Sequence, residues 1–249
     1  MLMSVIARQC ESVDYSELSG ARVLITGLTS ETGFDLARGF ADHGARLIIQ
    51  SPEDSPEMTE LAAVLAENSA AMKLFNDPLT TDDEAVTLVQ TAVQEFGGLD
   101  IVINLVSVPA GDVARLETLE DVEGLVLDAL RIPLRLTECV ANRMRLVWIE
   151  GSVLNIVRMP NVVGGRAAML ADVLRAELQE LTRAMANTWA DRGVRINAIA
   201  PPSSVGALSG QRAASDADLS AFALQLASRK SRSVTGYVLD AEGAAQRWC

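Results

Sequence analysis

Residues 22–33 read RVLITGLTSETG and decide the fold of this chain. The first part is an apolar run that ends at Gly27, which is typical of a buried β-strand. Gly33 then precedes a helical pattern of apolar residues that starts at Phe34. A strand, a turn and a helix in this order form the junction where α/β proteins hold a dinucleotide pyrophosphate on a helix N-terminus. Glu31 stands where such a turn carries a glycine, so the stretch predicts the fold and leaves the nucleotide site in question.

The alternation of apolar strands and amphipathic helices continues along the chain. Further strands are expected at 45–49, 71–75, 100–105, 146–156, 194–200 and 236–239. Helices are expected at 34–43, 61–67, 82–96, 117–142, 167–191 and 216–228. Strands joined through helices need crossover connections, so the sequence predicts an α/β, Rossmann-like, doubly wound parallel sheet. A single domain over 1–249 is expected, with residues 1–20 as its lead-in.

Composition and charge narrow the classes of function. The net charge of −12 is spread over scattered acidic residues, which argues against nucleic acid and anionic membranes as partners. We see neither a leader peptide nor an apolar segment of the roughly 20 residues that span a bilayer, and therefore expect a cytoplasmic protein. Cys10, Cys139 and Cys249 lack metal-ligand spacing, so no metal site is expected. His43 precedes Gly44 at a predicted helix end, where a structural role is expected.

Several motifs resemble those of a known protein family. TGLTSETG at 26–33 is similar to TGxxxGxG, and DIVINLVS at 100–107 is similar to a strand reading DILVNNAG. Asp77 matches an aspartate that contacts adenine, and residues 181–202 and 234–243 match the stretch after the catalytic helix and the final strand. Over nearly its full length, the sequence resembles the short-chain dehydrogenase/reductase family.

The resemblance implies four catalytic positions, and this chain departs from the family at each of them. The family has an asparagine, a serine, a tyrosine and a lysine where this chain has Ala129, Arg158, Ala171 and Arg175. Alanine has no proton to exchange, and a guanidinium stays protonated. Tyr15 and Tyr237 lie in the lead-in and in the last strand, away from the expected site. No catalytic residue is therefore expected in this chain.

The cofactor positions that the resemblance implies are also altered. Glu31 would repel a phosphate about 5 Å away by roughly 3 kcal/mol at an effective dielectric constant near 20. Ser51 and Pro52 replace the residue that selects the ribose or its phosphate, while Leu105 and Ser107 replace an asparagine and a glycine. The remaining matches to the family's cofactor positions are vestigial residues or polar residues at strand ends: Gly27, Gly33, Asp77 and Asn104. No cofactor is therefore expected to bind this chain. After Pro202, the segment that forms a substrate lid in the family is shortened.

These departures lead to the expectation of a catalytically inactive pseudoenzyme subunit that supports a catalytic, NAD-dependent family member. Helices 117–142 and 167–191 and the C-terminal strand are expected to pair with that partner in a heterodimer or heterotetramer, with NAD bound in the partner. Two alternatives stay open. One is an active oxidoreductase with relocated acid and base groups. The other is a ligand sensor in which Arg158, Arg166 and Arg175 receive an anion, rather than pairing with Asp172 and Glu177 or facing solvent.

Overall fold

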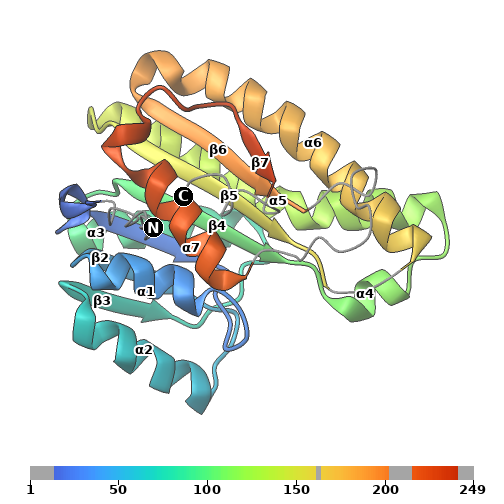
Figure 1. Cartoon of the computed structure of the whole chain (residues 1–249), viewed down its shortest axis with the longest axis horizontal. Helices are drawn as coiled ribbons and strands as arrows, with labels where there is room; N and C mark the ends of the chain where they lie inside the picture. The colour runs from blue at the N-terminus through green and yellow to red at the C-terminus, as the bar shows by residue number, and fades with distance from the viewer. Residues whose placement is uncertain (1–13, 161–163, 202–214, 241–249) are drawn as a thin grey trace, which may run out of the picture.

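The strands of the protein form one parallel sheet, as the sequence predicts. The computed structural model describes residues 14–160, 164–201 and 215–240. Within them the sheet has the order β3-β2-β1-β4-β5-β6-β7 (Figure 1). The strands are β1 (Arg22–Thr26), β2 (Arg46–Gln50), β3 (Ala71–Phe75), β4 (Ile101–Ser107), β5 (Gly151–Arg158), β6 (Val194–Ala200) and β7 (Val238–Asp240). The order reverses direction between β1 and β4, so their carboxyl ends border the crevice in which such sheets bind ligands.

Helices cover both faces of the sheet (Figure 1). The α-helices are α1 (Phe34–Asp42), α2 (Pro56–Asn68), α3 (Asp82–Phe96), α4 (Ala110–Ala114), α5 (Leu119–Leu146), α6 (Gly165–Trp189) and α7 (Asp216–Ala227). Short 3-10 helices span Ser16–Leu18, Ala190–Arg192 and Arg229–Ser231. Helices α1, α2 and α7 pack on one face, and α3, α5 and α6 on the other. The doubly wound fold is therefore confirmed. In the part of the chain that is described, none of the helices has the length and apolar character that crossing a membrane requires.

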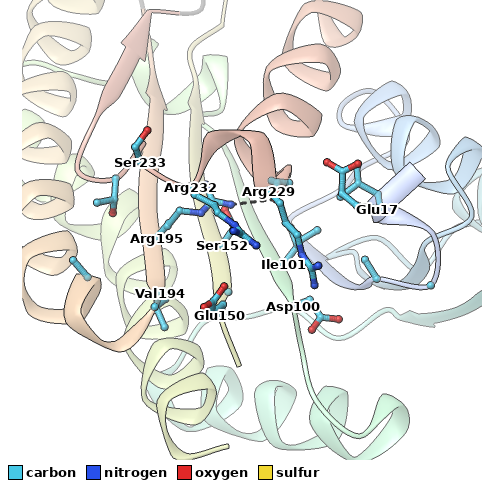
Figure 2. Close-up of a pocket in the computed structure, with 18 of the residues that line it drawn as sticks. Glu17, Asp100, Ile101, Glu150, Ser152, Val194, Arg195, Arg229, Arg232 and Ser233 are labelled. Carbon is cyan, nitrogen blue, oxygen red and sulfur yellow. Dashed lines mark hydrogen bonds between the residues drawn. The ribbon is translucent and has the colours of Figure 1, made fainter. Parts of the chain in front are cut away.

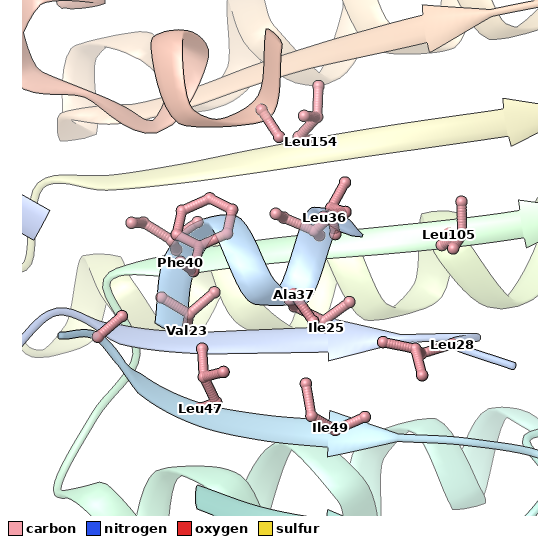
Figure 3. Packing of buried hydrophobic residues seen from close by; sticks show 14 of the residues in the cluster. Val23, Ile25, Leu28, Leu36, Ala37, Phe40, Leu47, Ile49, Leu105 and Leu154 are labelled. Carbon is pink, nitrogen blue, oxygen red and sulfur yellow. The ribbon is translucent and has the colours of Figure 1, made fainter. Parts of the chain in front are cut away.

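The apolar run of β1 follows from this double cover. Val23 and Ile25 pack against α1, where Phe40 is completely buried (Figure 3). Leu24, between them, points to the opposite face and joins the core under α3 and α5. Successive strand residues face opposite sides, so a strand covered on both sides needs apolar residues at every position.

Several element boundaries differ from the sequence-based expectation. Helix α2 starts at Pro56 rather than at residue 61, because the Ser55 side chain caps it by accepting a hydrogen bond from the Met58 N–H at 3.1 Å. Helix α5 continues to Leu146, where a strand was expected, and β5 starts only at Gly151. The short helix α4 lies between the strand expected at 100–105 and the helix expected at 117–142, where no helix was expected. The shortened segment after Pro202 and residues 1–13 and 241–249 lie outside the described residues.

Candidate functional site

A cavity of about 270 Å³ opens at the carboxyl ends of β1 and β4, where the fold places its crevice. Gly27 and Asn104 line it from the strands, and Ala129 and Pro133 line it from α5. The structure thus brings together six of the positions that the sequence singled out: Gly27, Pro52, Asn104, Leu105, Ser107 and Ala129. The cavity wall is mainly apolar. Its apolar lining includes Leu79, Leu105, Ile132 and Leu136.

The glycines of the loop between β1 and α1 are required by close approach to β4. Gly27 has a φ of 75°, and a Cβ atom there would lie 2.0 Å from the carbonyl oxygen of Leu105. Gly33 has a φ of 91°, and a Cβ atom there would lie 2.6 Å from the Leu105 side chain. Both glycines therefore shape the junction of strand and helix, as the sequence predicts, whether or not a nucleotide binds.

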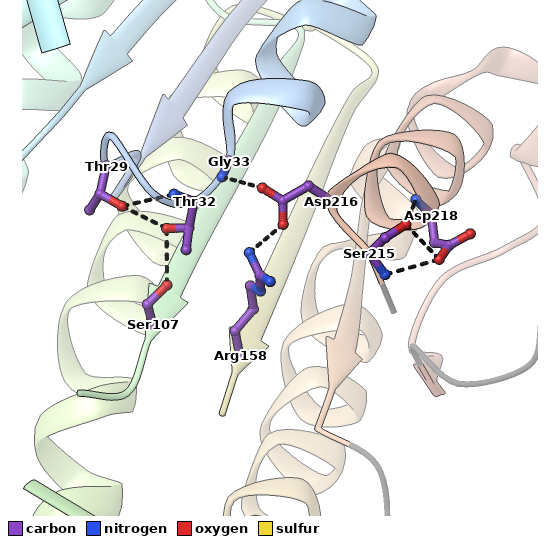
Figure 4. A network of polar contacts seen from close by, with 8 residues as sticks. All are labelled: Thr29, Thr32, Gly33, Ser107, Arg158, Ser215, Asp216 and Asp218. Carbon is purple, nitrogen blue, oxygen red and sulfur yellow. Dashed lines mark hydrogen bonds and ion pairs between the residues drawn. The ribbon is translucent and has the colours of Figure 1, made fainter. Parts of the chain in front are cut away.

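Two carboxylates of the chain itself accept hydrogen bonds from backbone amides of this loop. The Ser30 N–H donates to Oε2 of Glu53 at 2.8 Å, and the Gly33 N–H donates to Oδ2 of Asp216 at 3.0 Å. Arg158, at the end of β5, forms an ion pair with the other oxygen of Asp216 (Figure 4). The family's serine position is thus joined to the start of α7, and Arg158 pairs with Asp216 rather than with Asp172 or Glu177.

A glutamine at the end of β2 bridges the loop at Gly27 and the main chain at Asp77. Oε1 of Gln50 accepts from the Gly27 N–H at 2.9 Å, and its Nε2 donates to the carbonyl oxygen of Asp77 at 2.7 Å. The side chain of Gln50 is buried, so it is a fixed wall of the site. The Asp77 residue is exposed, and its main chain supports the crevice through this bond.

Asn104 takes part in a buried network beneath the cavity. Its Oδ1 accepts from the Thr26 hydroxyl at 3.1 Å, and its Nδ2 donates to Oδ1 of Asn155 at 2.8 Å. Nδ2 also lies 3.3 Å from the carbonyl oxygen of Pro133 and from Oγ1 of Thr137. The network ties β1, β4 and β5 to α5, which is a structural task for a residue that matches the family motif.

The other positions of the expected catalytic set lie apart from the cavity lining. Ala171 is buried on α6, and Nη1 of Arg175 donates to the carbonyl oxygen of Pro201 at 2.8 Å. Tyr15 donates to Gln225 at 3.1 Å and contacts the ring of His43 edge-on, while Tyr237 is exposed. Neither tyrosine is among the residues that line the crevice.

The histidine and the described cysteine have structural surroundings. Nδ1 of His43 lies 2.7 Å from the carbonyl oxygen of Gly39, and His43 ends α1 before Gly44, as predicted. Cys139 is half-buried on α5, and burial raises the pKa of its thiol. The raised pKa keeps this thiol protonated and therefore less reactive.

The residues that sequence reasoning missed are Gln50, Glu53 and Asp216. Gln50 and Glu53 directly flank the Ser51-Pro52 pair, which replaces the family's specificity residue, so the signal lay in the adjacent positions. Asp216 begins α7 and is more than 180 residues from the loop that it contacts. Only the packing of α7 against α1 brings Asp216 to that loop.

A larger cavity of about 610 Å³ lies at the opposite edge of the sheet, at the amino ends of β4, β5 and β6 (Figure 2). Arg195 reaches into this region, where its guanidinium donates to the carbonyl oxygens of Leu226 at 2.6 Å and Ala227 at 3.1 Å. Burial lowers the pKa of Arg195. Because these carbonyls end α7, Arg195 completes the hydrogen bonding of that helix, and we assign this region a structural role.

Comparison with known proteins gives relatives over most of the chain. An uncharacterised oxidoreductase of Thermotoga maritima is 30% identical over 185 residues, which cover 73% of this chain and 71% of that protein. Galactitol 2-dehydrogenase (L-tagatose-forming) of Cereibacter sphaeroides is 26% identical and covers 93% of this chain and 97% of its own length. The solved structure of an NADH-dependent reductase, A1-R′, complexed with NAD has a TM-score of 0.75 at 23% identity, over 92% of this chain and 98% of that one. At this identity the structural match supports the fold alone.

The names of these relatives contradict the expectation that the chain is not an enzyme. Galactitol 2-dehydrogenase and the 2-dehydro-3-deoxy-D-gluconate 5-dehydrogenase of Dickeya dadantii, which is 28% identical over 191 residues, are oxidoreductases. The expectation came from a few side chains around one crevice, whereas the similarity extends over most of the chain. The wider similarity therefore points to an enzyme.

The family model that matches is described as enoyl-(acyl carrier protein) reductase, and it matches residues 27–209. This range starts at the loop glycine Gly27. It includes the described residues of the crevice other than Thr26 and Asp216. It covers well over half of the sequence. The chain therefore belongs to the short-chain dehydrogenase/reductase family.

Proposed function

We propose that this chain is a subunit of an NAD-dependent oxidoreductase and assembles with a second family member, as a heterodimer or heterotetramer. The observation that carries the proposal is the occupancy of the proton-transfer positions by Ala171 and Arg175, with Arg175 bonded to the Pro201 carbonyl. An alcohol oxidation needs a group that accepts the hydroxyl proton, and neither side chain does so at neutral pH. In the assembled enzyme the partner contributes the tyrosine and lysine pair and NAD, and this chain is part of the enzyme that oxidises the alcohol.

Exposed apolar side chains on the two long helices support pairing through α5 and α6. Leu127 on α5 is 71% exposed and Met169 on α6 is 38% exposed. Tyr237, directly before β7, is 59% exposed and would extend the contact to the last strand. Large apolar side chains in these positions lose their contact with water when a second subunit covers them, which favours association.

The proposed substrate class rests on the pattern of substitutions at the family's catalytic and cofactor positions. This pattern is similar to that of one of the two kinds of subunit in hydroxy(phenyl)methyl-succinyl-CoA dehydrogenase, an enzyme of anaerobic toluene degradation. We therefore propose a benzylic hydroxyacyl-CoA as the substrate of the assembled enzyme. Residues 246–249, which lie outside the described part, would help shape the partner's site.

Coexpression with the product of a neighbouring family gene tests this function. We expect a stable complex by light scattering after gel filtration, and NAD-dependent oxidation of a benzylic hydroxyacyl-CoA that requires both chains. The double variant Leu127→Glu, Met169→Glu should dissociate the complex, because both charges would be buried in the interface. Val64→Glu on α2 is the matched control, since Val64 is 44% exposed on the opposite face of the sheet and should leave the complex intact.

Two results would contradict the proposed assembly. The first is a chain that stays monomeric in the presence of the partner. The second is full dehydrogenase activity of this chain alone, which would place the proton-transfer groups in its own site.

A further inference from the structure

We propose that Asp216 and Glu53 occupy the anion subsite of the loop at residues 27–33 and set the specificity of this crevice against phosphorylated ligands. Each carboxylate takes the place that a phosphate oxygen would need, because each already accepts a hydrogen bond from a loop amide. This inference concerns the chain's own crevice and does not depend on the proposed partner or substrate.

The donors that the two carboxylates occupy are those that attract anions. Gly33 is the N-cap residue of α1, so its N–H lies at the positive end of the helix dipole. The Ser30 N–H lies three residues earlier in the same loop. A pyrophosphate at this junction would need such free N–H groups, and here the bonds to Asp216 at 3.0 Å and to Glu53 at 2.8 Å already satisfy them.

Asp216 is held in place by rigid surroundings. It is the first residue of α7, whose N-terminus is fixed by the capping box of Ser215 and Asp218. Helices α1 and α7 pack so closely that a Cβ atom on Gly39 would lie 2.3 Å from Oγ of Ser220. Arg158 pairs with the second oxygen of Asp216 (Figure 4). A ligand that displaces Asp216 must therefore break the Gly33 bond and compete for Arg158, or shift a packed helix.

The charge of the two carboxylates adds repulsion to this occupancy. A carboxylate about 5 Å from a phosphate, at an effective dielectric constant near 20, weakens binding on the order of a hundredfold. Arg158 supplies one positive charge, but Asp216 neutralises it. Neutralising Asp216 while keeping its shape therefore leaves the charge of Arg158 unbalanced, and this cation becomes available to a phosphate.

Titration with inorganic pyrophosphate and with NAD tests the inference. The variants are Asp216→Asn, Glu53→Gln and both together, which keep the size of each side chain and remove its charge. We expect calorimetry to show wild-type binding weaker than millimolar, a gain of about tenfold or more for each single variant, and a larger gain for the pair. Adenosine carries no phosphate and should show no gain in any variant.

Matched controls change the same charge nearby. Asp218→Asn lies on the same turn of α7, where Asp218 bonds to Ser215 instead of to the loop, and Glu60→Gln lies on α2, where Glu60 is exposed. Neither control should change pyrophosphate binding by more than about twofold. An equal gain in the controls would show a general charge effect and overturn the assignment of Asp216 and Glu53.

A measurement on the wild-type chain covers the case in which a variant fails to fold. The backbone amide signals of Ser30 and Gly33 should stay unchanged in NMR spectra when pyrophosphate is added to several millimolar. Saturable shifts of both amides at submillimolar pyrophosphate would overturn the inference. Folded double variants that bind pyrophosphate no better than the wild type would also overturn it.

Discussion

Nδ2 of Asn104 donates a hydrogen bond to Oδ1 of Asn155 at 2.8 Å, and this bond joins β4 to β5 directly beneath the crevice. Both side chains are buried, at 1% exposure each. The Thr137 hydroxyl, on α5, lies 3.1 Å from the same Asn155 oxygen. A position that the family motif associates with the cofactor strand thus serves here as the centre of a buried polar network.

Replacing Asn104 with leucine should destabilise the fold. The variant leaves the Thr26 hydroxyl and the Asn155 oxygen without their Asn104 partner, and such losses in a buried network cost about 2–4 kcal/mol in the free energy of unfolding. Urea denaturation at pH 7 measures this change. Asn187→Leu, at an exposed position of α6, should change stability by less than about 0.5 kcal/mol. Equal stability of the two variants would show that the network contributes little.

Substituting Gly27 with alanine should be among the most destabilising single changes in the chain. The new Cβ atom would lie 2.0 Å from the Leu105 carbonyl oxygen, at a φ of 75° that alanine rarely adopts, so we expect a loss of roughly 3 kcal/mol or more. Gly124→Ala in α5 is the control, because nothing lies within 4 Å of its Cβ position and alanine favours a helix by about 0.5–1 kcal/mol. Thermal unfolding should therefore move in opposite directions for the two variants. A Gly27→Ala variant as stable as the wild type would contradict the close approach of β1 and β4.

Asp100 should make stability depend on pH. Burial raises its pKa, but the hydrogen bonds from the Arg22 backbone and side chain, at 2.9 and 2.8 Å, outweigh burial and bring the pKa below its usual value. A carboxyl with a depressed pKa in the folded state stabilises the protein above its unfolded pKa, which is about 3.9, and loses that contribution as the pH falls through the folded value. Asp100→Asn should therefore cost about 1.5–3 kcal/mol at pH 7 and progressively less below about pH 4.

Urea unfolding at a series of pH values from about 7 to 3 measures the effect of Asp100→Asn. Asp42→Asn is the comparison, because Asp42 pairs with Arg38 at 3.6 Å on an exposed helix surface, where ion pairs contribute at most about 1 kcal/mol. A stability loss in Asp100→Asn that is the same at pH 7 and pH 3 would show that packing, and not charge, is responsible.

Local patterns predicted the elements that depend on local rules. The apolar run of β1 and the helix that follows Gly33 were both found from periodicity, because a strand covered on two faces and a helix covered on one have distinct patterns. The boundaries of α5 and β5 were misplaced, since apolar residues continue from Leu146 through the turn at Trp148. Trp148 has a φ of 56°, and this turn conformation in a bulky residue gives no signal in the sequence.

By itself the sequence determined the parallel doubly wound sheet, the family and the identity of the side chains at its catalytic positions. Those properties depend on the periodicity of apolar residues, on residue spacing and on motifs, all of which can be read from the sequence. Only the tertiary structure decided what the loop amides bind and what Asn104 does. Asp216 and Gly33 lie far apart in the chain, and their contact exists because α7 packs against α1. A hydrogen bond of this kind depends on a helix position set by the whole core, and local sequence patterns do not carry that information.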